Sequence, residues 1–207
     1  MIEITNEDNM ALMARYPDKY FNLAIVDPPY GINRDGQSGS RKGNGKGRKG
    51  FNFKGWDNET PTAEYFEELF RVSKNQIIWG ANYFTKFLPS SMGWLFWDKG
   101  QRIKQSDGEL AYTSYQQAMK VIEYGRHELS IEGTMHPTQK PVVLYKWLLE
   151  KYAQQGDKIL DTHLGSGSIA IACHDYNFDL TACELDKEYF DKAMERINNH
   201  MAQQKLF

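Results

Sequence analysis

Apolar residues recur along this chain with two different periods, which together predict strands that alternate with helices. Short apolar runs bounded by turn-forming residues predict buried strands at residues 2–5, 22–26, 76–80, 93–98, 158–162 and 180–184. Apolar positions three and four residues apart predict helices at residues 9–16, 61–72, 82–88, 141–153, 168–176 and 187–201. Residues 109–115 and 118–124 are expected to form a further pair of strands. This alternation favours an α/β fold with a Rossmann-like, doubly wound, mostly parallel sheet that includes an antiparallel strand pair.

The composition is that of an ordinary globular protein. The chain has 207 residues, 41% of them hydrophobic and 25% charged, which predicts one domain over residues 1–207 and argues against disorder, collagen and coiled coil. No stretch approaches the roughly 18 apolar residues of a membrane span, and the first residues lack a secretory signal pattern. The two cysteines, Cys173 and Cys183, do not have metal-binding spacing. We therefore expect a cytoplasmic protein without a structural metal.

Positive charge is concentrated in one segment of an otherwise acidic chain. The net charge is −2, yet residues 34–54, here called the basic segment, contain six glycines, one acidic residue and seven basic residues. The basic residues are Arg34, Arg41, Lys42, Lys46, Arg48, Lys49 and Lys54. A glycine-rich segment of this charge buries too little apolar surface to fold by itself, so we expect a mobile loop that contacts nucleic-acid phosphates. A solvated linker is the simpler alternative.

A glycine-rich turn follows the strand predicted at residues 158–162. Residues 161–167, here called the glycine turn, include Asp161, His163, Gly165, Ser166 and Gly167. Glycines in such a turn let a ligand approach the backbone, as in nucleotide sites at the carboxyl ends of strands. The next strand ends in Glu184, an acid placed to hold ribose hydroxyls. Together these features predict a nucleoside-binding site, although a solvated strand end would explain Glu184 alone.

The most specific motif is Asp27-Pro28-Pro29-Tyr30, here called the proline turn, which ends the strand predicted at residues 22–26. The Asp27 carboxylate and the Pro28 carbonyl can both accept hydrogen bonds from one exocyclic amine. The Tyr30 ring can stack on the base that bears this amine, and Pro29 stiffens the turn. The motif therefore predicts a site for an unstacked adenine or cytosine. A plain strand-ending turn is common for two prolines but rare with these two neighbours.

The order of these motifs resembles the amino-group DNA methyltransferases, specifically the circularly permuted β class of the N6-adenine type. In that class the proline turn precedes the glycine turn, and a segment like residues 136–141, His-Pro-Thr-Gln-Lys-Pro, precedes the helix next to the cofactor. The resemblance spans nearly the whole chain and implies the fold of S-adenosylmethionine-dependent methyltransferases. It implies that S-adenosyl-L-methionine is bound by Asp8, Thr138, Lys140, Asp161, His163, Gly165, Ser166, Gly167 and Glu184. Within this set, Asp8 would lie toward the adenine, and Thr138 and Lys140 toward the methionine part.

The resemblance also implies a reaction on double-stranded DNA. Asp27, Pro28, Pro29 and Tyr30 would hold a flipped base while the methyl group passes to its exocyclic amine. The acid at position 27 favours N6 of adenine over N4 of cytosine, because cytosine enzymes more often have serine there. Methylation of a ring carbon needs a cysteine after a proline, which this chain lacks. Methylation of RNA or of a protein amide, an NAD-dependent oxidoreductase and a non-catalytic nucleic-acid-binding relic fit the motifs less well.

Two departures from the family pattern affect recognition and cofactor contacts. His163 stands where the family most often has phenylalanine, and only about ten residues separate Tyr124 from Met135, where the class usually has a target-recognition region. We therefore expect a minimal enzyme of a bacterial or phage-infected cell. Its recognition of DNA would depend on the basic segment or on a partner, either a second copy or a specificity subunit. His127, His174 and His200 are scattered in the sequence and do not predict a metal site.

Overall fold

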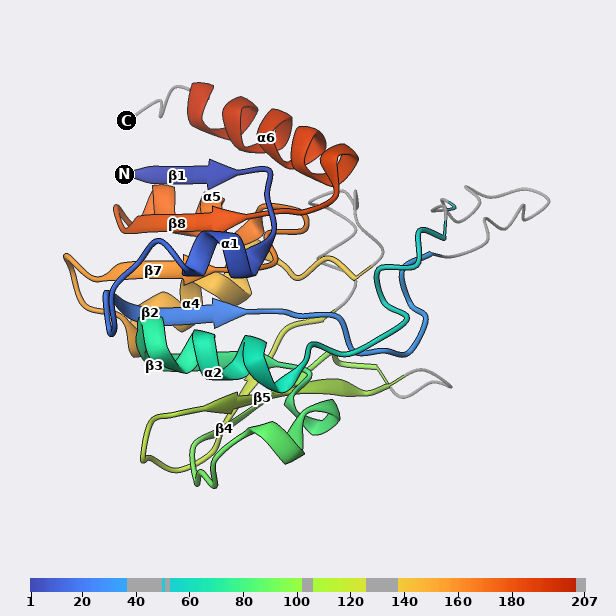
Figure 1. Ribbon diagram of the computed structural model, residues 1–207, viewed down its shortest axis with the longest axis vertical. Helices are drawn as coiled ribbons and strands as arrows, with labels where there is room; N and C mark the ends of the chain where they lie inside the picture. Colours follow the sequence, from blue (N-terminus) through green and yellow to red (C-terminus); the bar gives the residue numbers. More distant parts are fainter. Residues whose placement is uncertain (37–49, 51–52, 102–105, 126–137, 204–207) are drawn as a thin grey trace.

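One mixed sheet organises the molecule. The computed structural model describes residues 1–36, 50, 53–101, 106–125 and 138–203. Within these residues eight strands pair in the order β1-β8-β7-β2-β3-β5-β4-β6 (Figure 1). The strands are β1 (Ile2–Thr5), β2 (Phe21–Val26), β3 (Ser73–Trp79), β4 (Trp94–Asp98), β5 (Gly108–Thr113), β6 (Lys120–Glu123), β7 (Lys158–Asp161) and β8 (Asp179–Cys183). β5 runs antiparallel to β3 and β4, and the other neighbouring pairs are parallel.

Helices cover both faces of this sheet (Figure 1). They are α1 (Asn9–Met13), α2 (Ala63–Val72), α4 (Val142–Tyr152), α5 (Ser168–Asp175) and α6 (Lys187–Ala202). One core packs α4, α5 and α6 on the sheet through residues such as Leu148 and Ile169, and the other packs α1 and α2 through residues such as Leu12 and Phe66. A strand covered on both faces must be apolar on both faces, and five of the six β2 residues are buried. The predicted Rossmann-like α/β fold is confirmed.

Several elements differ in detail from the prediction. The helix expected at residues 82–88 is instead two 3-10 turns, η1 (Ala81–Tyr83) and η2 (Thr85–Phe87). Between them Phe84 has φ −119°, outside the helical region, so one continuous helix cannot form. The strands expected at residues 109–115 and 118–124 both form as β5 and β6, and β4 lies between them. None of the described helices has both the length and the apolar character needed to cross a bilayer.

Candidate active site

The sheet order brings the two sequence motifs together. The proline turn follows β2, the glycine turn follows β7, and these parallel strands are neighbours at the centre of the sheet. Ala24 lies opposite Leu160 in their ladder, so both turns leave the same edge. In open α/β sheets ligands bind outside the carboxyl ends of strands where the strand order reverses. Motifs far apart in the sequence therefore share one site.

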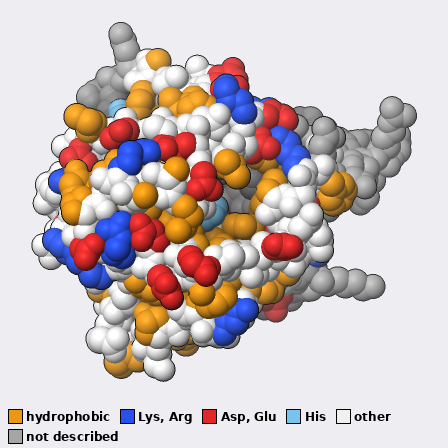
Figure 2. Space-filling model, in the orientation of Figure 1, with side chains coloured by type: hydrophobic (Ala, Val, Ile, Leu, Met, Phe, Trp, Pro, Cys, Tyr) orange, Lys and Arg blue, Asp and Glu red, His pale blue; other side chains and the backbone are white. Residues whose placement is uncertain are grey.

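A cavity of about 710 Å³ lies between the two turns, within the roughly 300–1,000 Å³ typical of small-molecule sites. Figure 2 shows a hollow on this face, surrounded by hydrophobic and acidic side chains. Predicted site residues that line the cavity are Asp8, Asp27, Pro29, Lys54, Thr138, Lys140, His163, Gly165, Ser166 and Glu184. Pro28, Tyr30, Asp161 and Gly167 were also predicted for the site, but they lie outside this lining.

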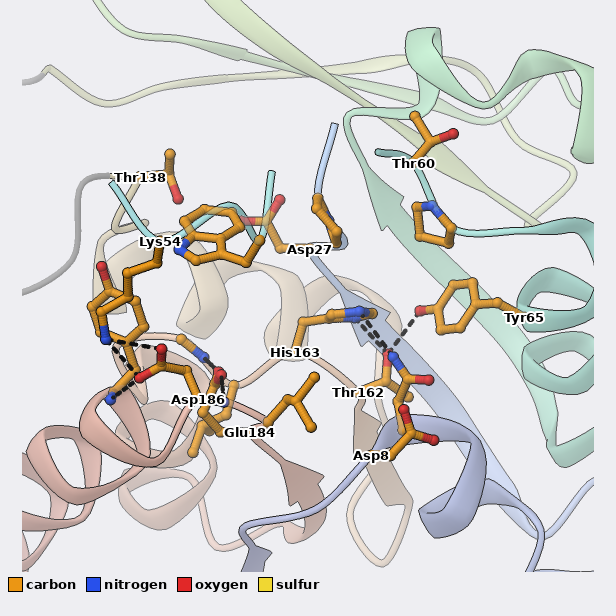
Figure 3. Close-up of a pocket in the computed structure, with 18 of the residues that line it drawn as sticks. Asp8, Asp27, Lys54, Thr60, Tyr65, Thr138, Thr162, His163, Glu184 and Asp186 are labelled. Carbon is orange, nitrogen blue, oxygen red and sulfur yellow. Dashed lines mark hydrogen bonds and ion pairs between the residues drawn. The ribbon is translucent and has the colours of Figure 1, made fainter. Parts of the chain in front are cut away.

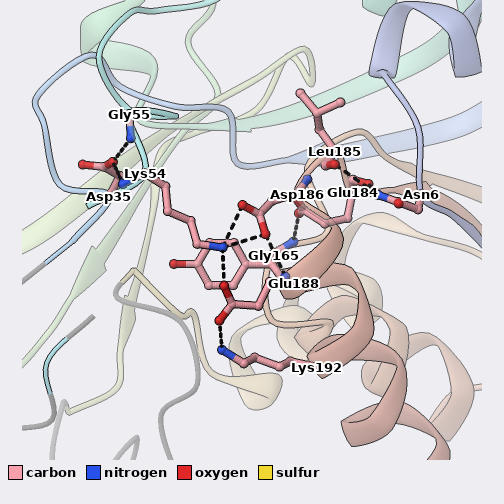
Figure 4. A network of polar contacts seen from close by, with 11 residues as sticks. Asn6, Asp35, Lys54, Gly55, Gly165, Glu184, Leu185, Asp186, Glu188 and Lys192 are labelled. Atoms are coloured by element: carbon pink, nitrogen blue, oxygen red, sulfur yellow. Dashed lines mark hydrogen bonds and ion pairs between the residues drawn. The ribbon is translucent and has the colours of Figure 1, made fainter. Parts of the chain in front are cut away.

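The glycine turn is fixed by Glu184. Its Oε2 accepts a hydrogen bond from Gly165 N at 2.9 Å, and its Oε1 accepts one from Asp186 N at 2.9 Å (Figure 4). Burial raises the pKa of the Glu184 carboxyl, against the lowering effect of these two hydrogen bonds. A carboxylate oxygen has two lone pairs, so each oxygen can accept one further hydrogen bond from a ligand hydroxyl. This geometry suits a ribose.

Gly167 has a packing role rather than a lining role. It adopts φ +75°, and a Cβ at this position would lie 2.8 Å from Ile197 Cδ1. The absence of a side chain therefore allows α6 to pack on the turn. Asp161 is likewise part of the turn itself, because it is 2% exposed and its Oδ1 accepts a hydrogen bond from His163 N. Burial raises the pKa of Asp161 to about 8.

His163 forms the floor of the cavity with its ring held on both sides (Figure 3). Asn9 Nδ2 donates to His163 Nε2 at 3.1 Å, so the imidazole proton lies on Nδ1, which donates to Thr162 Oγ1 at 2.9 Å. Tyr65 contacts both, since its hydroxyl is 2.7 Å from Thr162 Oγ1 and its ring meets the imidazole edge-on. Burial lowers the pKa of His163 to about 4, which keeps the ring neutral at pH 7. A neutral ring can lie against a cationic or apolar ligand without repulsion.

Asp8 is shared between the cavity and a helix. Its Oδ1 caps α1 by accepting from Met10 N and Ala11 N, while the residue lines the cavity. Thr138 lines the opposite part of the cavity (Figure 3). The Ser166 hydroxyl is 3.1 Å from that of Ser168 in the first turn of α5. These positions are compatible with the predicted cofactor contacts.

The proline turn places Asp27 in a buried charge network. Lys140 Nζ lies 2.5 Å from Asp27 Oδ2 and 3.0 Å from Glu109 Oε2, and the Tyr30 hydroxyl donates to Asp27 Oδ1 at 2.6 Å. Burial raises the pKa of Asp27, with the Lys140 ammonium acting in the opposite direction. Burial alone would raise the pKa of Glu109, but Lys140 and Lys99 lower it to about 2. Lys140 was predicted to contact the methionine part, whereas the structure directs its ammonium to the proline turn.

The Tyr30 ring already has an aromatic partner. It stacks on Tyr83 with ring centroids 5.2 Å apart and planes inclined by 15°. Gly80, at φ +68°, lies against the same ring, since a Cβ there would come within 2.1 Å of a ring carbon. Tyr83 is 43% exposed. The ring predicted to stack on the target base therefore stacks on Tyr83 in this structure.

A family model described as DNA methylase, N6_N4_Mtase, matches residues 78–195, more than half of the chain. The chain belongs to this family of DNA methylases. The matched segment includes residues 138–140 and the glycine turn but begins after the proline turn. Members of the family depend on S-adenosylmethionine. The prediction of an amino-group DNA methyltransferase is confirmed at this level.

Individual relatives agree with the family. The type II methyltransferase M.HpaI of Haemophilus parainfluenzae is 25% identical over 86% of this chain and 68% of its own length. The crystal structure of the M1.HpyAVI-SAM complex is 17% identical, with a TM-score of 0.62 over 95% of this chain and 100% of that chain. The PvuII DNA methyltransferase, described as cytosine-N4-specific, is 10% identical, with a TM-score of 0.66 over 100% of this chain and 88% of that chain. The solved structures establish the likeness of fold.

The end of the basic segment reaches the cavity, because Lys54 lines it together with Gly165 and Asp186. Lys54 Nζ lies 2.8 Å from carboxylate oxygens of Asp186 and Glu188, and 4.3 Å from the centre of the Tyr189 ring (Figure 4). Arg34 lies at the other end of the segment, and its backbone N–H donates to Asp57. The predicted phosphate contacts Arg41, Lys42, Lys46, Arg48 and Lys49 lie outside the described residues. The described Lys54 side chain therefore pairs with carboxylates of this chain, whereas it was predicted to contact nucleic-acid phosphates.

The histidines of the methylase are less scattered than the sequence indicates. Among the described residues, His200 Nε2 lies 2.7 Å and His174 Nδ1 3.3 Å from the same oxygen of Asp175. α5 and α6 pack together and so bring the two rings within contact. Lys146 Nζ pairs with the other Asp175 oxygen at 2.7 Å, so a cation already neutralises this carboxylate. His174 and His200, which are distant in the sequence, therefore lie side by side in the fold.

Several residues of the site were not predicted from the sequence. Asn9 and Tyr65 line the cavity, and Glu109 joins the Asp27 network. Asn9 and Tyr65 lie in helices that were predicted from their apolar positions, and the local sequence does not indicate that these two residues face the site. For Glu109 the sequence does contain a signal. An acid at the start of an apolar strand is uncommon unless it is paired, so Glu109 could have been predicted to have a charged partner.

Proposed function

We propose that this methylase transfers a methyl group from S-adenosylmethionine to the N6 amine of an adenine flipped out of DNA. The observation that supports this most directly is the position of Asp27 in the lining of the same cavity as Glu184. A ligand bound through its ribose at Glu184 and a base held by its amine at Asp27 would then share one enclosed space. The chemistry needs positioning more than covalent catalysis.

The cavity has the groups that the methyl donor requires. An acid for the ribose stands at Glu184, Asp8 lies on the same side, and neutral His163 forms the floor between them and Asp27. Lys54 and Trp56 also line the cavity. Bound S-adenosylmethionine supplies a methyl group on a sulfonium, which is already activated for transfer.

The proline turn would act on the acceptor amine. The Asp27 carboxylate and the Pro28 carbonyl would accept its two N–H groups, which draws the nitrogen lone pair out of conjugation with the ring. The new N–C bond would form as the S–C bond breaks, which would leave a neutral thioether, and one amine proton would pass toward Asp27. The Lys140 ammonium lowers the pKa of Asp27 against the raising effect of burial, because an adjacent positive charge favours the accepting carboxylate.

N4 of cytosine is the second candidate. The PvuII enzyme, a structural neighbour over the whole of this chain, is described as cytosine-N4-specific. An acid at position 27 supports adenine, since serine is more usual there in cytosine enzymes. The circularly permuted order of motifs supports assignment to the β class.

Nucleoside analysis tests the proposal and separates its two forms. DNA from a host without methylated bases, incubated with the methylase and S-adenosylmethionine, is digested and quantified by mass spectrometry. We expect N6-methyladenine, and N4-methylcytosine would establish the second candidate instead. Asp27→Ala should lose roughly tenfold to a hundredfold or more in turnover, the loss expected for hydrogen bonds to a charged group, while cofactor affinity is kept. An Asp27→Ala variant that turns over like the parent would disprove the role of Asp27.

A further inference from the structure

Asp57, a buried carboxylate that is not part of the proline turn, binds the backbone at the end of that turn. Asp57 is 2% exposed and lies just after the basic segment. Its Oδ1 accepts hydrogen bonds from Tyr30 N at 2.7 Å and Gly31 N at 2.9 Å, and its Oδ2 accepts one from Arg34 N at 2.7 Å. A fourth link joins the main chains, because Asn33 N donates to Asp57 O at 3.0 Å. One side chain thus accepts hydrogen bonds from three backbone N–H groups between residues 30 and 34.

The backbone of the proline turn depends on an acceptor of this kind. Pro28 and Pro29 have no N–H, and β2 ends at Val26, so the sheet ladder does not continue into the turn. The N–H groups of Tyr30 and Gly31 are then left to a side chain, and a buried N–H without an acceptor is costly. Gly31 adopts φ +70°, a left-handed conformation that favours glycine, at the point where Asp57 holds the chain.

We propose that Asp57 is a positioning residue for methyl transfer, acting through the main chain of Tyr30 and Gly31. This inference rests on the proposed function. Because Asp57 fixes the main chain at Tyr30, it fixes where the Tyr30 hydroxyl meets Asp27 and where the Tyr30 ring meets Tyr83. It also joins the start of the basic segment to the catalytic turn through Arg34 N. Its loss would let the catalytic groups shift while leaving the glycine turn in place.

The structure offers a matched control in Asp35. This carboxylate is also 2% exposed and accepts backbone hydrogen bonds within the same segment, from Lys54 N and Gly55 N. Neither of these donors belongs to the proline turn. Asp57 and Asp35 therefore have equal burial and similar chemistry, and they differ in which backbone they hold.

The test compares Asp57→Asn with Asp35→Asn in the full chain. An amide has one acceptor oxygen, so its NH₂ group would face a backbone N–H that the carboxylate accepted. We expect Asp57→Asn to lower kcat by about tenfold to a hundredfold more than Asp35→Asn, the effect of misplacing groups that act in the transition state. The dissociation constant for S-adenosylmethionine and the melting temperature should be similar in the two variants. Amide hydrogen exchange should rise at Tyr30 and Gly31 in Asp57→Asn, and at Lys54 and Gly55 in Asp35→Asn.

Each alternative outcome is distinct. Equal losses of kcat in the two variants, or unchanged exchange at Tyr30 and Gly31, overturn the positioning role. A parent protein that methylates no base overturns the proposed function instead, and the exchange data then still report whether Asp57 holds the turn. If Asp57→Asn does not fold, Asp57→Glu keeps the charge but displaces the acceptor oxygens, and wild-type kcat in that variant equally overturns the role.

Discussion

Lys140 Nζ lies 2.5 Å from Asp27 Oδ2, so the segment before α4 supplies the counter-ion of the proline turn after β2. The same ammonium contacts Glu109 in β5, and it is 3% exposed. Burial alone would lower the pKa of Lys140, but the two carboxylates raise it above its usual value. One buried cation therefore links three elements at the point where the target amine would bind.

Removing this cation should change the pH dependence of methyl transfer. In Lys140→Met the Asp27 and Glu109 carboxylates lose the charge between them, so the pKa of Asp27 rises further. Because Asp27 accepts from the amine as a carboxylate, the acidic limb of the kcat profile should move to higher pH. Lys99→Met is the control, since Lys99 contacts Glu109 but not Asp27 in the described ion pairs. An unchanged acidic limb in Lys140→Met would show that the ion pair does not tune Asp27.

Glu184 should determine cofactor affinity. Losing hydrogen bonds from a carboxylate to ribose hydroxyls costs roughly 1.5–3 kcal/mol, or about tenfold to a hundredfold in affinity. Calorimetry with S-adenosylmethionine should show this loss for Glu184→Ala and a smaller one for Glu184→Gln, which keeps an acceptor for Gly165 N. Glu68→Ala serves as the control, because this carboxylate pairs with Arg71 and does not line the cavity. Parental affinity in Glu184→Ala would remove Glu184 from the cofactor site.

We expect most basic residues of the basic segment to act in DNA binding, and Lys54 to act in cofactor binding. If Z of its basic residues contact phosphates, log affinity for duplex DNA falls with log salt at a slope of about −0.9Z. Neutralising Arg41, Lys42, Arg48 and Lys49 together should flatten this slope and leave cofactor affinity unchanged. A variant with the parental slope and parental DNA affinity would reduce this part of the chain to a linker.

Lys54 is the exception within that segment. Its ion pairs with Asp186 and Glu188 lie beside the cofactor cavity, so Lys54→Met should weaken S-adenosylmethionine binding. Partly exposed pairs contribute about 0.2–1 kcal/mol, which limits the effect to about fivefold. Lys192→Met, which removes a cation from Glu188 alone, should have less effect in the same titration. If Lys54→Met binds S-adenosylmethionine as tightly as the parent does, the basic segment has no role in cofactor binding.

The buried acid of the glycine turn should make stability depend on pH. The pKa of Asp161 is about 8 in the folded chain, against roughly 3.9 for an unfolded aspartate. The folded state keeps this proton while the unfolded state loses it, so stability falls as pH rises from about 4 to about 8. The slope from this one group is at most about 1.4 kcal/mol per pH unit. Asp161→Asn keeps the acceptor for His163 N, and denaturant titrations should show that its stability advantage over the parent grows across this range.

The sequence by itself determined the alternation of strands and helices and the two turns that end β2 and β7. Proline restricts the backbone locally and glycine permits turns that other residues avoid, while apolar periodicity indicates which face of an element is buried. Both signals can therefore be recognised in the sequence alone. For the same reason the short apolar stretch at residues 82–88 was misassigned, because its burial pattern does not distinguish a helix from two 3-10 turns.

Only the tertiary structure decided which polar groups meet. Lys140 reaches Asp27, Asp57 holds Tyr30, and Lys54 pairs with Asp186 because β2 and β7 are neighbours and the connecting segments return over the same edge of the sheet. A buried charge or N–H requires a partner, but the requirement does not specify where along the chain that partner lies. The pairing of distant polar residues is therefore a property of the packed sheet, not of any local pattern.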